Sequence, residues 1–232
     1  MNKHRFLFVL TLIVGLVLCA GFGFSWYMGK PKNDDAYFER VILAFEKSDK
    51  QVLPKPGGIV FTGSSSIRSW KTLANDMAPL PVISRGFGGA HMSHILYNFD
   101  RIITAYNPKA VVIFVGGNDI AAGKSVQRLI SNYQTFIEKF RKELPDTDLW
   151  ILGMKPSVRR WKLWGEMQIV DEAFKALSAA NEKVTFVDSG KVLLGSDGRL
   201  DAVYASDGLH LNTKGYHRWS NVLKPLLLER YD

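Results

Sequence analysis

Residues 58–66 read Gly-Ile-Val-Phe-Thr-Gly-Ser-Ser-Ser, and this stretch decides the fold. Its apolar run has no alternating polar residues, which is typical of a strand that is covered on both faces. The glycine and the three serines that follow indicate a turn at the end of that strand. Similar short apolar or β-branched runs follow at 81–84, 110–115, 149–153 and 184–187. The sequence therefore predicts five buried strands.

Amphipathic stretches separate these runs. Between the third and fourth runs, apolar residues at helical spacing mark one face of a helix: Leu129, Ile130, Tyr133, Phe136, Ile137 and Phe140. Similar faces occur within 37–45 and 170–177. Because alternating strands and helices give a parallel sheet between two helix layers, we expect an α/β three-layer sandwich with a five-stranded parallel sheet.

The composition limits the class of protein. The chain has 232 residues, 47% of them apolar, which is enough for one sizeable core and excludes disordered and collagen-like classes. Cys19 is the one cysteine, so no intrachain disulfide can form, and no Cys/His cluster has zinc-ligand spacing. The formal net charge is +8, but no nucleic-acid-binding motif accompanies it, so we expect no nucleic-acid partner.

The N-terminal segment 1–30 differs from the rest of the chain. Residues 6–28 are uncharged and mostly apolar, and Lys3 and Arg5 precede them. As a helix this run would be about 34 Å long, enough to cross a bilayer. A cleaved signal peptide or a buried core helix are the alternatives. We favour a membrane anchor that places the rest of the chain outside the cytoplasm, with secretion after cleavage as the second interpretation.

The rest of the chain divides into a linker with a first helix, 31–57, and the sheet-containing domain, 58–232. Four polar clusters follow predicted strands: 63–66, 85–89, 116–119 and 207–210. Each cluster alone fits an ordinary turn or helix cap. Because ligands bind beyond the carboxyl ends of the strands in an open parallel sheet, the four clusters together predict an active site there.

These clusters contain the groups that acyl transfer needs. A serine hydroxyl is a weak nucleophile until a base takes its proton, and His210 is the candidate base. Asp207 lies three residues earlier and could accept the other ring N–H. The N–H of the serine, a glycine N–H and the Asn118 amide could stabilise the oxyanion of a tetrahedral intermediate.

The ordered set Gly-Ser-Ser-Ser-Ile, Arg-Gly-Phe-Gly-Gly, Gly-Gly-Asn-Asp and Asp-Gly-Leu-His resembles the four blocks of the SGNH, or GDSL-type, hydrolases. The resemblance spans residues 58–228. It implies a flavodoxin-like sandwich and a serine esterase mechanism that uses neither a metal nor a cofactor.

The resemblance also implies roles for individual residues. By position, Ser65 is the nucleophile, and it shares the oxyanion hole with Gly89 and Asn118. Asp207 and His210 complete the triad. The chain departs from the usual Gly-Asp-Ser motif, because a serine precedes Ser65 where the family has aspartate. Since successive residues of an extended strand point to opposite sides, we expect the two neighbouring serines to face away from the site.

Some further residues have competing interpretations. A basic segment with Arg159, Arg160 and Trp161 follows the fourth strand. It could bind an anionic or sugar-like substrate, contact the membrane through Trp161 and Trp164, or simply form a basic helix start whose tryptophans pack into the domain. His91 and His94 lie on one side of a predicted helix, but without a third ligand we expect surface or pocket-rim residues and no metal site.

The sequence thus predicts a serine esterase for small acyl esters, such as O-acetyl groups on glycans. A lysophospholipase or thioesterase acting on lipid esters is the alternative within the enzymes. A non-catalytic module that binds a glycan in the same crevice is the alternative outside them.

Overall fold

The computed structural model describes residues 34–52 and 54–231. Its sheet has five strands, all parallel, in the order β2-β1-β3-β4-β5. The strands are β1 (Ile59–Gly63), β2 (Val82–Gly86), β3 (Ala110–Phe114), β4 (Asp148–Leu152) and β5 (Val184–Val187). The five predicted strands and their parallel arrangement are confirmed, and the strand order is that of flavodoxin-like folds.

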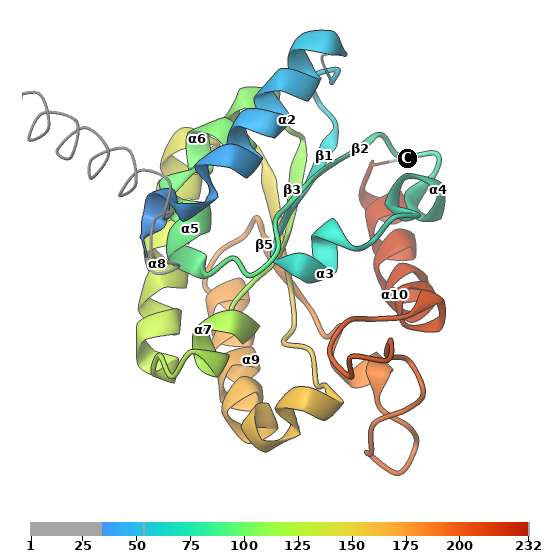
Figure 1. Ribbon diagram of the computed structural model, residues 1–232. Helices are drawn as coiled ribbons and strands as arrows, with labels where there is room; N and C mark the ends of the chain where they lie inside the picture. The colour runs from blue at the N-terminus through green and yellow to red at the C-terminus, as the bar shows by residue number, and fades with distance from the viewer. Residues whose placement is uncertain (1–33, 53, 232) are drawn as a thin grey trace, which may run out of the picture. The chain divides into compact units, whose positions relative to one another are not determined.

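Helices cover both faces of this sheet (Figure 1). The larger ones are α2 (Glu39–Gln51), α8 (Val126–Glu143), α9 (Trp164–Ala179) and α10 (Thr213–Tyr231). The shorter α-helices are α3 (Ser65–Arg68), α4 (Leu73–Met77), α5 (Met92–Tyr97), α6 (Phe99–Ile102) and α7 (Gly117–Ala121). The described residues also form four short 3-10 helices: η1 (Asp35–Phe38), η2 (Thr104–Tyr106), η3 (Val158–Leu163) and η4 (Lys191–Leu193).

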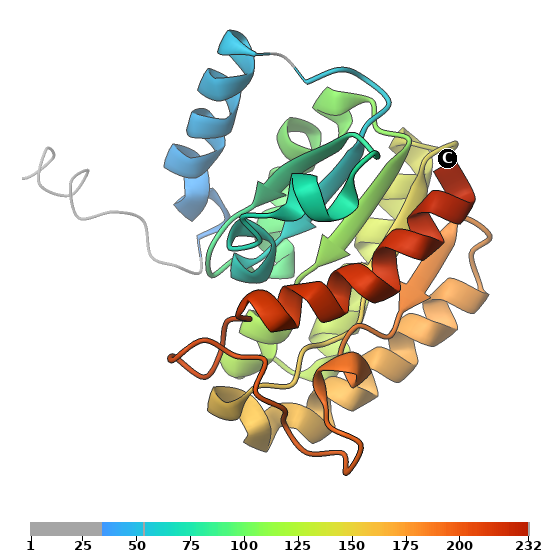
Figure 2. The same cartoon turned by 90° about the vertical axis from the view of Figure 1, so that its right-hand side faces the viewer.

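One face of the sheet packs against α3, α4 and α10, and Figure 2 shows α10 running across it. Alternate strand residues, including Phe61 and Phe114, supply the apolar side chains of this layer. Trp70 stacks on Tyr216 at 5.2 Å between ring centroids, and Trp219 lies beside Phe114 at 4.9 Å. Helices α5, α6, α8 and α9 lie on the opposite face (Figure 1), so the predicted three-layer sandwich is confirmed.

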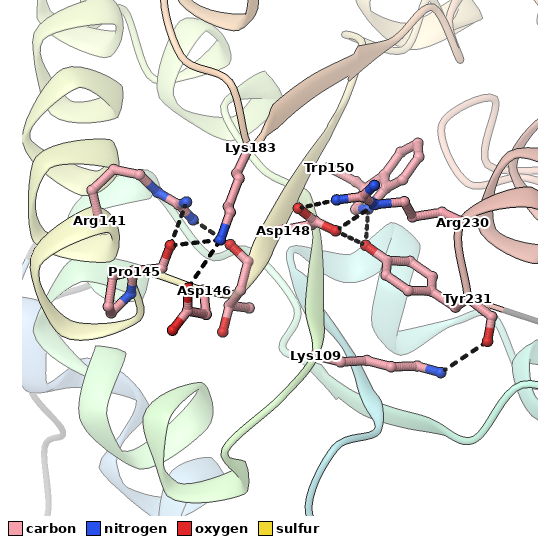
Figure 3. Close-up of polar contacts among 10 residues, drawn as sticks. Lys109, Arg141, Pro145, Asp146, Asp148, Trp150, Lys183, Arg230 and Tyr231 are labelled. Carbon is pink, nitrogen blue, oxygen red and sulfur yellow. Dashed lines mark hydrogen bonds and ion pairs between the residues drawn. The ribbon is translucent and has the colours of Figure 1, made fainter.

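The end of α10 is fastened to the amino-terminal edge of the sheet (Figure 3). Asp148, the first residue of β4, accepts hydrogen bonds from Arg230 Nε at 3.0 Å and from the Tyr231 hydroxyl at 2.7 Å. Trp150 Nε1 donates to the same hydroxyl at 2.9 Å. This polar cluster therefore fixes α10 at the edge of the sheet away from the predicted site.

A second cluster joins α2 to β2. Arg85 is buried, its guanidinium forms an ion pair with Asp49, and its Nε donates to the Tyr106 hydroxyl at 2.5 Å. That hydroxyl donates to Asp49 at 2.6 Å, and burial raises the pKa of Tyr106 to about 12. Arg85, which the sequence placed in a loop cluster, is thus part of the sheet and ties it to a helix.

The described residues divide within α2, between Arg40 and Val41, into two units. In the first unit, Asp34 caps η1 by accepting a hydrogen bond from the Ala36 N–H at 2.8 Å. Within residues 34–52 and 54–231, no helix has both the length and the apolar character needed to cross a bilayer. The predicted anchor at 6–28 lies outside the described residues.

Candidate active site

The turn after β1 holds the three serines. Gly63 has a φ of +131°, and a Cβ there would lie 2.0 Å from the carbonyl oxygen of Phe114, so a side chain is excluded at this position. Ser64 caps α3 with extended backbone and donates its N–H to that carbonyl at 2.9 Å. Ser65 and Ser66 are already helical, so the expected strand alternation is wrong for this pair. Ser65 is half-buried, whereas its two neighbours are buried.

Ser65 begins a chain of hydrogen bonds to residues far along the sequence. His210 Nε2 lies 2.8 Å from Ser65 Oγ, and His210 Nδ1 lies 2.5 Å from Asp207 Oδ2. The other Asp207 oxygen accepts the backbone N–H groups of Leu209 and His210, each at 2.9 Å. The hydrogen bond from the His210 ring, together with these backbone bonds, holds the pKa of Asp207 well below its usual range. The carboxylate therefore stays ionised and oriented toward the ring.

The loop that carries His210 is tied to the segment after β4. The Arg159 N–H donates to the Gly208 carbonyl at 3.0 Å, and the Tyr204 hydroxyl donates to the Pro156 carbonyl at 2.8 Å. Lys155 Nζ donates to the Leu209 carbonyl. These three contacts hold the His210 loop in place, whereas Ser65 is held by the end of strand β1.

The side-chain amide of Asn118 is held at both ends. Its Nδ2 donates to the Ala90 carbonyl at 2.9 Å, and its Oδ1 accepts from Arg160 Nη2 at 2.8 Å. Because a guanidinium only donates, it fixes which end of the amide is oxygen and leaves the second N–H of Nδ2 for a ligand. The backbone N–H groups of Ser65 and Gly89 also donate to no residue of the described chain.

Gly89 precedes the Ala90 carbonyl that Asn118 contacts, and its φ is +83°. Asp119 braces the same region. Its buried carboxylate accepts from the Met92 N–H, at 3.2 Å to Oδ2, and from Lys124 Nζ at 2.9 Å. Burial raises the pKa of Asp119 despite the nearby Lys124. The loops after β2 and β3 are thus joined beside Asn118.

A small pocket, open in part to solvent, lies beside the serine turn. Its lining comprises Ser64, Ser65, Ser66, Phe114, Gly117, Asn118, Lys155, Arg160 and Leu209. Substrate binding was one interpretation of the three residues Arg159, Arg160 and Trp161, and only Arg160 lines this pocket. Arg159 is exposed, and so is Trp161, with 41% of its surface accessible. The structure does not bring these two into the site.

Sequence reasoning missed Lys155. This residue is only 7% exposed, and burial lowers its pKa to about 7, with the charge of Arg160 as a smaller cause. Its position three residues after β4, at the carboxyl edge of the sheet, was the available signal. Only packing reveals that its amine turns toward the pocket and the His210 loop.

The expectation for His91 and His94 is wrong, because both are buried rather than at the surface or pocket rim. His94 lies in the first turn of α5, and its Nδ1 accepts the His91 N–H at 2.9 Å. Over the described ranges, no group of three His, Cys, Asp or Glu residues is arranged to hold a metal ion.

Both the sequence and the fold of this chain match known proteins. The model of the GDSL-like lipase/acylhydrolase family matches residues 55–218. The chain belongs to this family. The protein is therefore an acylhydrolase, and the α/β fold and hydrolase class predicted from the sequence are confirmed.

Relatives of this hydrolase include the platelet-activating factor acetylhydrolase IB subunit alpha1 of Homo sapiens and of Bos taurus. Each is 25% identical over 178 residues, which cover 73% of this chain and 75% of the relative. A GDSL-like lipase from Bacteroides thetaiotaomicron shares the fold with a TM-score of 0.69 and 19% identity, covering 85% of this chain and all of that one. The family 3 carbohydrate esterase of Clostridium thermocellum has a TM-score of 0.62 and 17% identity, covering 76% of this chain and 97% of its own.

Proposed function

We propose that this hydrolase cleaves esters of short acyl groups through an acyl-enzyme formed on Ser65. The observation that carries the proposal is the hydrogen-bonded chain from Ser65 Oγ through the His210 ring to the Asp207 carboxylate. Its geometry is that of a serine nucleophile, a general base and an orienting acid.

In the first half of the reaction, Ser65 Oγ attacks the ester carbonyl carbon while His210 Nε2 takes the hydroxyl proton. Asp207 holds the Nδ1–H and stabilises the imidazolium that forms. His210 then gives the proton to the departing alcohol as the carbon–oxygen bond breaks. In the second half, a water attacks the acyl-enzyme with the same histidine as base, and the free acid leaves with Ser65 restored.

The negative charge of each tetrahedral intermediate needs fixed donors. We assign these to the backbone N–H groups of Ser65 and Gly89 and to the Asn118 amide, which the family pattern also favours. The hydrogen bonds from Asn118 to Ala90 and from Arg160 to Asn118 keep the amide in one orientation before substrate arrives. Donors that need no reorganisation are the ones that lower the barrier.

The proposed substrate is an ester of a small acyl group, with O-acetyl groups on glycans among the candidates. The pocket is small, and Phe114 and Leu209 bound it. The curated relatives are named as acetylhydrolases, which agrees with a short acyl group. An acyl series of p-nitrophenyl esters tests the assignment: acetate should have the highest kcat/KM, and a preference for long chains would favour the lysophospholipase or thioesterase alternative.

The test of the nucleophile uses the run of serines itself. Ser65→Ala should lose labelling by a fluorophosphonate and nearly all turnover of p-nitrophenyl acetate. Ser64→Ala and Ser66→Ala serve as matched controls, which should keep labelling and lose activity only moderately. A folded Ser65→Ala protein that still labels, beside a control that does not, would remove Ser65 as nucleophile.

A further inference from the structure

Two cations line the pocket beside the proposed nucleophile. Lys155 reaches it from the segment after β4, and Arg160 reaches it from η3. Within the described part of the chain, the side chain of each makes one hydrogen bond, Lys155 Nζ to the Leu209 carbonyl and Arg160 Nη2 to Asn118 Oδ1. Neither forms an ion pair with a carboxylate of the described residues.

The nearest acidic group is already engaged. Asp207 accepts the ring N–H of His210 and two backbone N–H groups, and its Coulomb interaction with Lys155 is weaker than the effect of burial. Burial lowers the pKa of both cations, and the charge of Arg160 adds to this effect at Lys155. Lys155 is therefore about half protonated near neutral pH, and no carboxylate of the described residues pairs with it or with Arg160. An anion beside them would favour the charged form of Lys155.

Buried charges are normally paired, because an unpaired one loses the solvation that water gives it. Protonated Lys155 keeps two donor hydrogens, and the remaining guanidinium N–H groups of Arg160 donate to no residue in the described part of the chain. If the hydrogen bonds of Lys155 to Leu209 and of Arg160 to Asn118 were only structural, they would need no charged donor. A neutral amide could donate either bond.

We propose that the ester substrate carries an anionic group, a carboxylate or a phosphate, close to the scissile bond, and that Lys155 and Arg160 bind it. This inference rests on the proposed function, because it assigns the substrate class of the same pocket. The anion supplies the counter-charge that the pocket lacks and occupies the donors that the protein leaves unused. Both chemistries present the oxygen acceptors that a guanidinium and an ammonium recognise.

Two pairs of esters separate the possible positions of the anion. On the acyl side, p-nitrophenyl hydrogen succinate is compared with p-nitrophenyl methyl succinate, which has the same leaving group. On the alcohol side, meta-acetoxybenzoate is compared with meta-acetoxybenzamide. A charge-assisted hydrogen bond is worth about ten- to a hundredfold, so kcat/KM should favour the anionic member of at least one pair by about tenfold or more.

Variants of Lys155 assign that preference to the pocket. Lys155→Met should reduce the preference severalfold, and Lys155→Arg should keep most of it. Lys162→Met removes an exposed charge from the same segment and should leave the preference unchanged. Arg160 stays intact in this test, because its loss would also release Asn118. Equal kcat/KM values within both pairs, or a preference that Lys155→Met leaves unchanged, would overturn the proposal.

Binding to Ser65→Ala protein separates this inference from the proposed function. The anionic ester should raise the melting temperature of that protein more than the neutral ester does. Selective stabilisation without turnover by the wild-type protein would support the anion site and reject the esterase mechanism. Turnover without any selectivity, in either rate or stabilisation, would support the mechanism and reject the anion site.

Discussion

Replacing Asp171 by asparagine is expected to remove a pH-dependent loss of stability. Asp171 lies on α9, is buried, and accepts the Met154 N–H at 2.7 Å. Burial is the largest cause that raises its pKa from 3.8 to about 7. Asparagine has the same shape and keeps an oxygen acceptor for Met154, so the exchange removes the titration and retains the contact.

The sign follows from proton binding in the two states. Between about pH 4 and pH 7, the folded protein holds a proton on Asp171 that the unfolded chain has released. The contribution of Asp171 to the free energy of unfolding is therefore greatest below pH 4 and falls as the pH rises to about 7. Above that pH the buried carboxylate is ionised in the folded protein, and the loss of stability is complete. A difference of about three pH units corresponds to at most about 4 kcal/mol.

Urea unfolding monitored by tryptophan fluorescence, at several pH values from 5 to about 8, measures this effect. The free energy of unfolding of Asp171→Asn minus that of the wild-type protein should increase as the pH rises. Glu182→Gln, which neutralises an exposed carboxylate just after the same helix, should show no such gain. If the difference in unfolding free energy between Asp171→Asn and wild type stays constant with pH, Asp171 does not bind the extra proton that its burial implies.

Two further substitutions test the oxyanion hole and the attachment of α2. Asn118→Ala should lower kcat by about 10²–10³-fold and change KM little, because the free N–H of the Asn118 amide acts mainly on the transition state. A near-normal kcat of this variant in steady-state assays would remove Asn118 from the oxyanion hole. Asp49→Ala should cost about 3–5 kcal/mol of unfolding free energy in urea titrations, because it strands the buried Arg85 charge. A loss below about 1 kcal/mol would mean that water solvates Arg85.

The strands and the location of the site could be predicted because both depend on local pattern. Uninterrupted apolar runs such as 110–115 are stable only inside a sheet covered on both faces, and the chain that leaves each parallel strand emerges at one edge. That rule places Ser65 after β1 and Asn118 after β3, on the two sides of the point where the strand order reverses. For His210, the residue types suggested a candidate base and the family resemblance implied its place in a triad, but no local pattern placed its loop beside Ser65.

The features that sequence reasoning missed depend on burial. Three buried polar residues belong to types that are common at surfaces: Lys155, Asp171 and His94. Only the packing of segments that are distant in sequence encloses them. The same is true of Arg159 and Arg160, neighbours in sequence of which one is exposed and the other lines the pocket. A 3-10 turn with a non-helical Arg160 separates their directions, and no sequence periodicity encodes that turn.

The two halves of the site are held by different means. Ser65 and the Asn118 loop leave adjacent strands, so the sheet register itself sets their separation. His210 comes from a long loop before α10 and meets Ser65 across 145 positions of sequence. The position of His210 depends on contacts with the segment after β4, where Lys155 donates to the Leu209 carbonyl. That segment is in turn held by α9, because Asp171 accepts the N–H of Met154. The distance between the proposed base and the proposed nucleophile is therefore maintained through α9 and β4. Lys155, which completes this connection, is also one of the two residues that we propose bind an anion.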